Sequence, residues 1–466
     1  MLAQMIGRNF RVAALSALLV LGPALVGGCS TAVSAPSQMA SPATAAPIVV
    51  GAAFPTSGNA AGLAGQELAG AQIAMDMVNA AGGANGRPIQ LVVKDLESDA
   101  DAPAVMAQLK ASGASVVLGA YSSALSISAS SAASDQGLVY WEAGAVADQL
   151  TGRGLPLVFR VGASGSTLGS NSATFAATQL APRLGKAVNQ VRVALVAARD
   201  DYASSVAGAA RSTAQAAGMQ VVADETYDMY TPDWAPVMAA LTTAKPDVIM
   251  LASHIPDGVA FRQAMISAGV HTGALIGTTM AQCDPDFAGD LGPDAIGVFA
   301  SDRPTGGFQP SALTTEARAV YDQFAAEWAK RGLPTNSTES YSDNGNGYGE
   351  YDITGPSPAG GGNQPTEEGI SGFSAAWALF HDVLPAAASQ ADLTPASIAA
   401  VARALDLPEG SLPNGAGLRF SSDPATLGQN ERATGVIWQW QAVNTYTFVW
   451  PPTYATGSIG FVPLAR

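Results

Sequence analysis

Short apolar segments alternate with longer Ala-rich segments along most of the chain from residue 48 onward. Most of the short segments are continuously apolar, which is typical of parallel strands buried on both faces. They predict strands at residues 48–54, 89–93, 115–118, 138–141, 191–196, 220–223, 248–251 and 274–276.

The longer segments carry apolar residues at helical spacing. They predict helices at residues 66–80, 102–111, 124–133, 168–184, 204–217, 236–243 and 258–268. Strands joined by helical crossovers form doubly wound α/β sheets, and the strands before residue 280 outnumber what one compact sheet needs. We therefore predict two doubly wound α/β lobes, with ligands bound at the carboxyl ends of the strands.

The last third of the chain predicts helices at 370–384 and 395–405 and closing strands at 417–420, 434–440 and 446–449. Before these, residues 335–368 are rich in Gly, Ser, Asn and Pro and show no periodicity, so we expect an inserted surface loop. Acidic residues in this loop fail the EF-hand spacing, so we favour a solvated loop over a calcium site and expect no metal.

The first residues have the pattern of an export signal. Arg8 and Arg11 precede 15 uncharged residues, 12–26, and Gly27, Gly28 and Cys29 follow. A membrane-spanning anchor is the alternative, but a span needs about 20 apolar residues. We expect a signal peptide over residues 1–28. The small residues before Cys29 resemble the lipobox of bacterial lipoproteins, which implies a lipid on Cys29 and anchoring to the cell membrane.

Residues 30–47 carry no charge and no aromatic side chain, so a flexible tether over 29–47 is expected. With Cys29 lipidated, Cys283 has no intramolecular disulfide partner and is interpreted as a packed thiol.

Composition excludes several function classes. The net charge of −15 opposes binding to nucleic acid or to an anionic lipid surface. Hydrophobic residues at 48% and charged residues at 13% indicate a folded body. Three histidines and two cysteines leave little for a zinc site. Nucleophile-elbow, phosphate-loop, HExxH and CxxC motifs are absent, so we expect neither an enzyme nor a bound cofactor.

A family resemblance rests on Gly70-Ala71, on residues 79–91 (NAAGGANGRPIQL) and on Asp95. This run closely resembles the helix–turn–strand hallmark of type I periplasmic solute-binding proteins, the leucine/isoleucine/valine, amide and urea receptors of ABC importers. Further landmarks follow in the family's order over residues 48–451: 117–119, 122–123, 159–160, 200–202, 246–247, Gly417 with Phe420, and 450–451.

The resemblance implies two lobes joined by three hinge crossovers, a cleft that closes on a solute, and delivery to a membrane permease. The first lobe would span residues 48–163 and 302–412, and the second 164–301 and 413–466. Hinges are expected near 162–165 and 300–303.

The resemblance also implies where the solute binds. Ser123 matches a serine at a helix N-terminus that binds a carboxylate or carbonyl; a plain N-cap is the alternative. Tyr202 matches a tyrosine that closes over the ligand, with simple cleft packing as the alternative. His254 stands where an aromatic side chain often lines the cleft, although a satisfied structural histidine fits equally well.

Three positions depart from the pattern of family members that bind amino acids, and His254, in place of an aromatic residue, is one of them. In the loop 142–146, which includes Gly144, Val146 replaces a hydroxyl-bearing residue. Thr279 replaces the acidic residue that pairs with the ligand ammonium. Glu142 is a candidate replacement for that acid, or else a salt-bridge or capping residue. Without any acid, an α-amino acid would bury an unpaired ammonium, and an uncharged amide, urea or carboxylate would fit better.

These observations predict a lipid-anchored extracytoplasmic solute-binding protein of an ABC importer. Its partners would be a small solute and a permease, with the lipid as its contact to the membrane, no nucleic acid, and a monomeric state. A ligand sensor on the same fold is the alternative. A secreted hydrolase is disfavoured by the scarcity of histidine.

Overall fold

The computed structural model describes residues 46–279, 282, 285–335, 364–390, 393–443 and 445–464. The predicted signal peptide, Cys29, most of the tether, Cys283 and most of the predicted inserted loop lie outside these residues. Across the described residues, no helix is both long and apolar enough to cross a membrane.

The first sheet has five parallel strands in the order β2-β1-β3-β4-β5. Its strands are β1 (Ile48–Phe54), β2 (Ile89–Asp95), β3 (Val116–Gly119), β4 (Val139–Glu142) and β5 (Val158–Arg160). Alternate residues of β1 face opposite layers. Val50 and Phe54 join the larger hydrophobic cluster, whereas Ala53 joins the cluster of helices α2 (Ala102–Ala111) and α3 (Ser123–Asp135).

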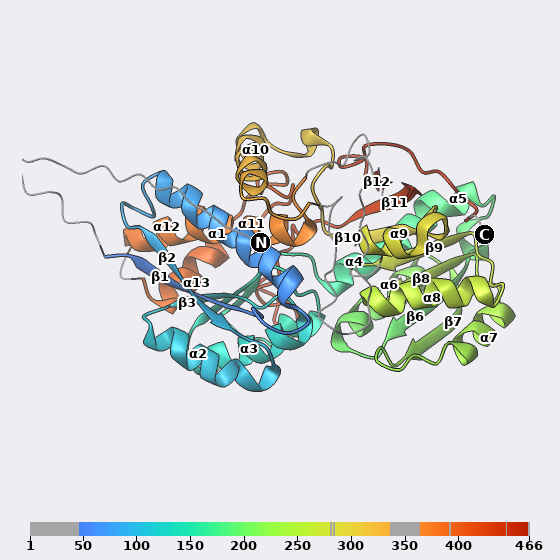
Figure 1. The fold of residues 1–466 in the computed structure, drawn as a ribbon, viewed down its shortest axis with the longest axis horizontal. Helices are drawn as coiled ribbons and strands as arrows, with labels where there is room; N and C mark the ends of the chain where they lie inside the picture. Colours follow the sequence, from blue (N-terminus) through green and yellow to red (C-terminus); the bar gives the residue numbers. More distant parts are fainter. Residues whose placement is uncertain are drawn as a thin grey trace, which may run out of the picture. The chain divides into compact units, whose positions relative to one another are not determined.

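The second sheet has seven strands in the order β12-β11-β10-β9-β8-β6-β7 (Figure 1). Strands β6 to β10 are parallel, and β11 and β12 close the edge as an antiparallel hairpin. The strands are β6 (Arg192–Ala198), β7 (Gln220–Tyr227), β8 (Val248–Ala252), β9 (Ala274–Thr278), β10 (Phe299–Asp302), β11 (Val436–Ala442) and β12 (Thr445–Trp450).

Helices cover both faces of this second sheet. Val193 and Leu195 of β6 pack in one cluster with Phe175, whereas Ala194 and Val196 pack in another. The helices are α4 (Gly165–Phe175), α5 (Ala181–Arg183), α6 (Asp201–Ala216), α7 (Trp234–Ala244), α8 (Ile255–Ser267) and α9 (Pro285–Leu291).

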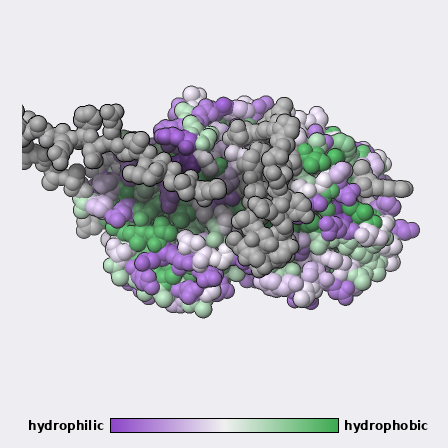
Figure 2. Space-filling view, viewed as in Figure 1, coloured by the Kyte–Doolittle hydropathy of each residue, from purple (hydrophilic) through white to green (hydrophobic). Residues whose placement is uncertain are grey.

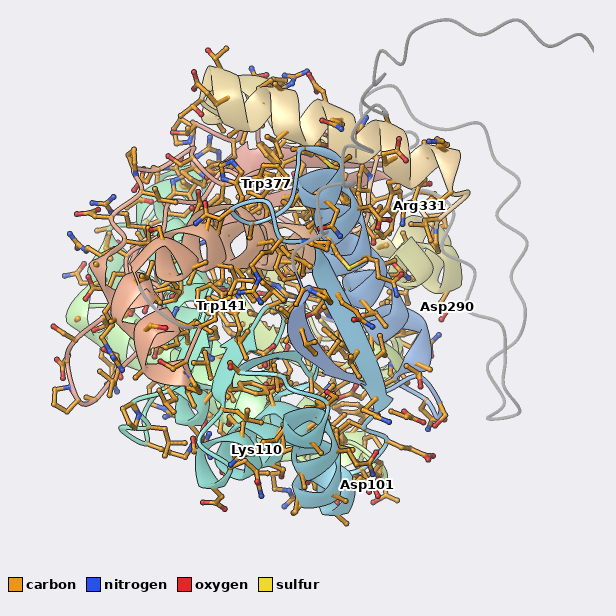
Figure 3. All side chains as sticks on the ribbon, turned by 90° about the vertical axis from the view of Figure 1, so that its left-hand side faces the viewer. Asp101, Lys110, Trp141, Asp290, Arg331 and Trp377 are labelled. Atoms are coloured by element: carbon orange, nitrogen blue, oxygen red, sulfur yellow. The ribbon has the colours of Figure 1, made fainter. Side chains whose placement is uncertain are left out.

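After β10 the chain returns to the first sheet as α10 (Thr315–Lys330), α11 (Glu367–Trp377), α12 (Leu384–Gln390) and α13 (Pro395–Ala404). Helix α11 lies beside α1 (Ala61–Ala80). A Cβ atom on Gly70 or Gly372 would overlap the backbone of the other helix, so glycine permits this close approach. Trp141 of β4 lies between the first sheet and these helices and donates its indole N–H to the Ala375 carbonyl at 2.9 Å (Figure 3).

Helix α10 shows how burial follows sequence periodicity. Its buried residues Ala317, Tyr321, Phe324 and Trp328 recur at helical spacing and form its inner face. The surface around α10, at the top of Figure 2, is mostly hydrophilic. The helix therefore covers the first lobe with one apolar stripe.

The chain passes between the two sheets three times: between β5 and α4, after β10, and between α13 and β11. Residues from all three crossovers line a cavity of about 10 Å³, large enough for about one water molecule. Gly162, Arg303 and Thr434 represent the three crossovers in its wall. The crossovers thus meet at one hinge.

The predicted fold class, two doubly wound α/β lobes with three crossovers, is confirmed. The exact lobe boundaries stay a prediction. One predicted strand is wrong: residues 417–420 form isolated bridges rather than a strand, and Phe420 packs edge-on against Trp141 and Phe159 of the first sheet. Strands β5 and β10 and helix α10 were not predicted.

Candidate functional site

The loops at the carboxyl ends of β3 and β4 lie together in the first lobe. Ser122 is the N-cap of α3, because its side chain accepts a hydrogen bond from the Leu125 N–H. Ser123 is the first helical residue, and its hydroxyl accepts a hydrogen bond from the Ala147 N–H at 3.1 Å. The reading of Ser123 as the N-cap is therefore wrong. Ser123 instead ties the start of α3 to the loop after β4.

Glu142 organises both of these loops from inside the lobe. Its Oε1 accepts hydrogen bonds from Gly144 and Ala145 at 2.9 and 2.8 Å. Its Oε2 accepts from the Tyr140 hydroxyl at 3.0 Å and from the Ala120 N–H at 3.2 Å. The side chain is fully buried, and burial raises its pKa although these hydrogen bonds oppose the shift. These contacts fit the alternative in which Glu142 is a capping residue for the backbone N–H groups of the loops.

A second buried acid lies directly behind this loop. Glu67 of α1 is fully buried beside Gly144, and within the described residues neither of its carboxylate oxygens accepts a hydrogen bond. Burial raises the pKa of Glu67 well above its usual value; the Glu142 charge adds to the shift and the Arg303 charge opposes it. Burial and the neighbouring Glu142 thus favour the protonated form of Glu67.

Gly144 and Val146 connect the first lobe to the hinge. The Gly144 carbonyl accepts a hydrogen bond from Nη1 of Arg303 at 2.6 Å. The Val146 carbonyl accepts from the Gly165 N–H at 2.5 Å, and its side chain packs in a hydrophobic cluster of the second lobe. Both residues therefore contact segments that would shift when the lobes move relative to each other.

The second lobe contributes Tyr202 and Thr279 at the carboxyl ends of its strands. The Tyr202 hydroxyl donates to the main-chain carbonyls of Ser253, at 3.1 Å, and Thr278. These hydrogen bonds hold the Tyr202 ring across the carboxyl ends of β6, β8 and β9. Thr279 is buried, has a φ of 39°, and donates its N–H to the Ser301 carbonyl at 3.0 Å.

His254 begins α8 and pairs with a residue that the sequence analysis did not select. Its Nε2 lies 2.7 Å from Oδ2 of Asp200, the N-cap of α6. Its backbone N–H donates to Asp257, which also accepts the hydroxyl hydrogen bond of Tyr227. The imidazole ring centroid lies 5.2 Å from that of Tyr202. His254 is thus held by acidic side chains from two helix starts.

Polar contacts join the two lobes beside these groups. Asp148 donates its backbone N–H to the Ser205 hydroxyl at 3.0 Å, and that hydroxyl lies 3.0 Å from the Gln149 side-chain oxygen. The Gln149 amide donates to Asp201 at 3.1 Å. The loop after β4 therefore faces the start of α6.

The structure sorts the predicted site residues into two groups. Ser123, Glu142, Gly144 and Val146 lie together at the carboxyl edge of the first sheet. Their counterparts at the carboxyl edge of the second sheet are Tyr202, His254 and Thr279. Contact of any of them with a solute stays a prediction.

The sequence analysis assigned no role to Glu67; it placed Asp200 only among the family landmarks and Arg303 only at an expected hinge. An aspartate directly before an Ala-rich helix is a cap signal that points to Asp200. Neither Glu67 nor Arg303 has a local signal, because their partners are distant in sequence. Among the described residues, no group of three or more His, Cys, Asp or Glu side chains is arranged to hold a metal ion.

Comparison with known proteins decides the family. The model of the family described as "Periplasmic binding protein" matches residues 47–345. The chain belongs to the periplasmic binding protein family. The predicted resemblance to its Leu/Ile/Val-binding type is confirmed, and the chain is a binding protein of this extracytoplasmic family rather than an enzyme.

Individual relatives match about nine-tenths of the chain. A Leu/Ile/Val-binding protein homolog 8 of Brucella suis is 30% identical over 427 residues, which cover 91% of this chain and 96% of that protein. The homolog 8 of Brucella abortus is 30% identical over 421 residues, covering 90% and 94%.

Solved structures share the fold at lower identity. One is a branched-chain amino acid ABC transporter protein of Silicibacter pomeroyi, with a TM-score of 0.67, 20% identity, and coverage of 90% of this chain and 99% of that one. Another is a branched-chain amino acid transporter substrate-binding protein of Streptococcus pneumoniae in complex with isoleucine, with a TM-score of 0.63, 21% identity, and coverage of 87% and 100%.

Proposed function

We propose that this protein captures a small polar solute outside the cytoplasm and delivers it to the permease of an ABC importer. The solute class is a branched-chain amino acid or a related amide or carboxylate. One observation carries the proposal: the carboxyl edges of two sheets carry polar side chains, the loop after β4 touches the start of α6, and three crossovers meet at one hinge.

Trapping a solute in this way needs no covalent chemistry. A hinged protein with an open and a closed arrangement shifts to the closed one when the solute contacts both lobes, because only the closed arrangement gains both sets of contacts. Contacts from the first lobe would bind the solute first, and contacts from the second would complete the closure.

The proposed contacts are of two kinds. In the first turn of α3, backbone N–H groups have no partner within the helix, and Ser123 lies beside them, so this edge suits a carboxylate or carbonyl. The second edge offers Tyr202, His254 and Thr279. Because donors from its own lobe occupy its carboxylate, Glu142 is proposed to shape the loop that includes Gly144 and Val146.

A thermal-melt screen of residues 48–466 tests this function. The panel contains leucine, valine, glutamate, urea, short amides and aromatic carboxylates. A solute at about 1,000 times its Kd adds roughly 4 kcal/mol to the free energy of unfolding, so a real ligand gives a clear shift in Tm. Silence across the panel would contradict the proposed solute class.

A second measurement distinguishes transport from sensing. Uptake of the radiolabelled ligand is compared in cells with and without the gene, with the protein restored on a plasmid as the control. Transport predicts loss of high-affinity uptake and its recovery on restoration. Unchanged uptake by cells that still respond to the solute would favour the sensor instead.

We further propose that Cys29 carries the lipid that anchors the mature protein to the membrane. The support is the apolar run 12–26, followed by small residues and a cysteine. A Cys29→Ser variant is expected to leave the membrane fraction, with Cys283→Ser as the matched control that stays there. Mass spectrometry of the mature N-terminal peptide identifies the lipid directly, and an unmodified Cys29 would overturn the proposal.

A further inference from the structure

The Asp200–His254 pair is a polar group in the second lobe that the proposed contacts do not yet explain. Oδ1 of Asp200 accepts the Ala203 N–H at 2.7 Å, and Oδ2 lies 2.7 Å from Nε2 of His254. The side chains are 26% and 19% exposed. Both groups are therefore held in place and still reach solvent.

The position of the pair faces the first lobe. Asp201 and Ser205, on the first turns of the helix that Asp200 caps, contact Gln149 of the first lobe. On the other flank, Ile255 follows His254 and packs against the larger hydrophobic cluster, most of which fills the first lobe. The exposed part of the pair thus lies between two places where the lobes meet.

The chemistry of the pair is that of a cation site. A carboxylate has about four acceptor positions, and these two hydrogen bonds, together with one from the Tyr202 N–H, use three of them. Burial pushes the pKa of Asp200 up, but hydrogen bonds from His254 and Ala203 outweigh burial and hold the pKa below its usual value. The group is therefore an anion at neutral pH with acceptor capacity to spare.

Other acids near the facing edges are less suited to this task. Glu142 is fully buried with both oxygens occupied, and Glu67 is sealed behind Gly144. Asp257 is buried and accepts hydrogen bonds from Tyr227 and from the His254 backbone. Asp201 is engaged by Gln149 on the outer side of the helix start.

We propose that the Asp200 carboxylate, positioned by His254, binds the ammonium group of the solute and selects α-amino acids over uncharged amides and simple carboxylates. The inference rests on the proposed function and deepens it. The edge with the N–H groups of α3 receives the solute carboxylate, and the edge with Asp200 receives its ammonium. His254 is a positioning residue: with a proton on Nε2, it donates to Oδ2 and fixes the orientation of the carboxylate.

The test compares leucine with 4-methylpentanoate, which has the same chain and carboxylate but no ammonium. Binding to the full mature protein is measured by calorimetry. The wild type is expected to bind leucine at least 10-fold more tightly. Asp200→Asn keeps the helix cap, because Asn caps as well as Asp, but removes the charge. It is expected to weaken leucine binding about 10- to 100-fold and to leave 4-methylpentanoate unchanged.

Two further variants separate the roles. Asp224→Asn, the control on an exposed acid of the same lobe that pairs with Arg211, is expected to change neither affinity by more than about 2-fold. His254→Ala is expected to weaken leucine binding selectively, and His254→Gln, which retains a side-chain N–H, to restore part of it. An equal loss of both ligands in His254→Ala would mean a merely structural role.

The outcomes also separate this inference from the proposed function. If the wild type binds amides or carboxylates as tightly as leucine, valine and glutamate, the inference fails while the solute-binding function stands. If Asp200→Asn leaves the preference for leucine intact, the inference fails in the same way. If no compound of the panel binds, both fail.

Discussion

The Glu67 carboxylate occupies the space that a Cβ atom on Gly144 would need. One residue belongs to helix α1, and the other to the loop after β4, which also touches Arg303 at the hinge. A side chain at position 144 would therefore push either the buried acid or the loop. With glycine there, the loop and the Glu67 side chain both keep their positions.

This contact predicts the effect of Gly144→Ala. The added methyl group overlaps Glu67, and overpacking of this kind costs about 1–3 kcal/mol. Urea denaturation is expected to show this loss. In a Glu67→Ala background the same substitution should cost much less, because the space is then free. Equal costs in both backgrounds would contradict the proposed clash.

A control for the glycine effect lies on the same helix. Gly65 of α1 has open space where its Cβ atom would lie. Gly65→Ala is expected to be neutral or to stabilise the protein by about 0.5–1 kcal/mol, because alanine favours the helix. A destabilisation there similar to that of Gly144→Ala would mean that loss of glycine, rather than the clash, is the cause.

The buried acids also predict how stability depends on pH. Burial raises the pKa of Glu67, and burial together with Glu367 raises the pKa of Glu368 to about 7. A carboxyl whose folded pKa exceeds its unfolded value of about 4.5 binds more protons in the folded state between these values. The free energy of unfolding should therefore fall as the pH rises from about 5 to 7, by at most about 1.4 kcal/mol per pH unit for each proton.

The measurement is urea denaturation at half-unit steps between pH 5 and pH 8. Glu67→Gln removes one titrating group and should flatten the decline. Glu97→Gln, on an exposed acid, is the control and should leave the slope unchanged. A wild-type stability that rises across this window would contradict the raised pKa of the buried acids.

Much of the fold follows from local pattern. Continuous apolar runs located β1, β6 and β8 because parallel strands buried on both faces have that signature. Strand β5 was not predicted because its three residues are too few to show a periodicity. Helix α10 had a clear signal in the spacing of its buried residues and should have been predicted.

The wrongly predicted strand at 417–420 shows a limit of the local apolar pattern as a strand signal. Its apolar residues are buried, but Phe420 is buried against the rings of Trp141 and Phe159 rather than in a ladder of hydrogen bonds. Burial and strand formation have the same local signal in a short segment. Only the tertiary partners, about 260 or more residues away, distinguish them.

The sequence predicted which candidate residues follow strands, but it did not predict the contacts that these residues make. Sequence order placed Ser123, Tyr202 and His254 after strands, where α/β sheets bind ligands. The pairing of His254 with Asp200 joins residues 54 positions apart, and the contact of Glu67 with Gly144 joins a helix to a loop from another strand. Neither can be derived without the arrangement of the strands.

Glu142 gives a prediction that separates scaffold from ligand contact. Ala120, Tyr140, Gly144 and Ala145 donate hydrogen bonds to it, as does the Ser126 side chain, and all of these donors belong to its own lobe. Glu142→Gln presents an amide NH₂ to two of these donors, so it should reduce the free energy of unfolding by about 2–4 kcal/mol. Because the loop is disturbed as a whole, affinity for leucine and for 4-methylpentanoate should fall by similar factors. A loss confined to leucine would instead make Glu142 the ammonium partner.

Arg303 ties the hinge to two parts of the first lobe. Its Nη1 donates to the Gly144 carbonyl at 2.6 Å, Nη2 pairs with Glu367 of α11, and the side chain lines the cavity where the crossovers meet. Removing one partner of a buried ion pair leaves the other charge uncompensated, at a cost of about 3–5 kcal/mol. Arg303→Met should therefore destabilise the protein by that amount, and the double variant Arg303→Met/Glu367→Met should recover part of it.

The same arginine should matter for closure as well as for stability. Without its bond to Gly144, the loop after β4 is no longer tied to the crossover that follows β10. The change in radius of gyration on adding leucine, measured by small-angle scattering, should then become smaller or require more leucine. Arg318→Met, in an exposed pair with Asp322, is the control and should cost less than about 1 kcal/mol and leave closure unchanged. Normal closure in a folded Arg303→Met protein would show that the arginine stabilises the hinge without taking part in its motion.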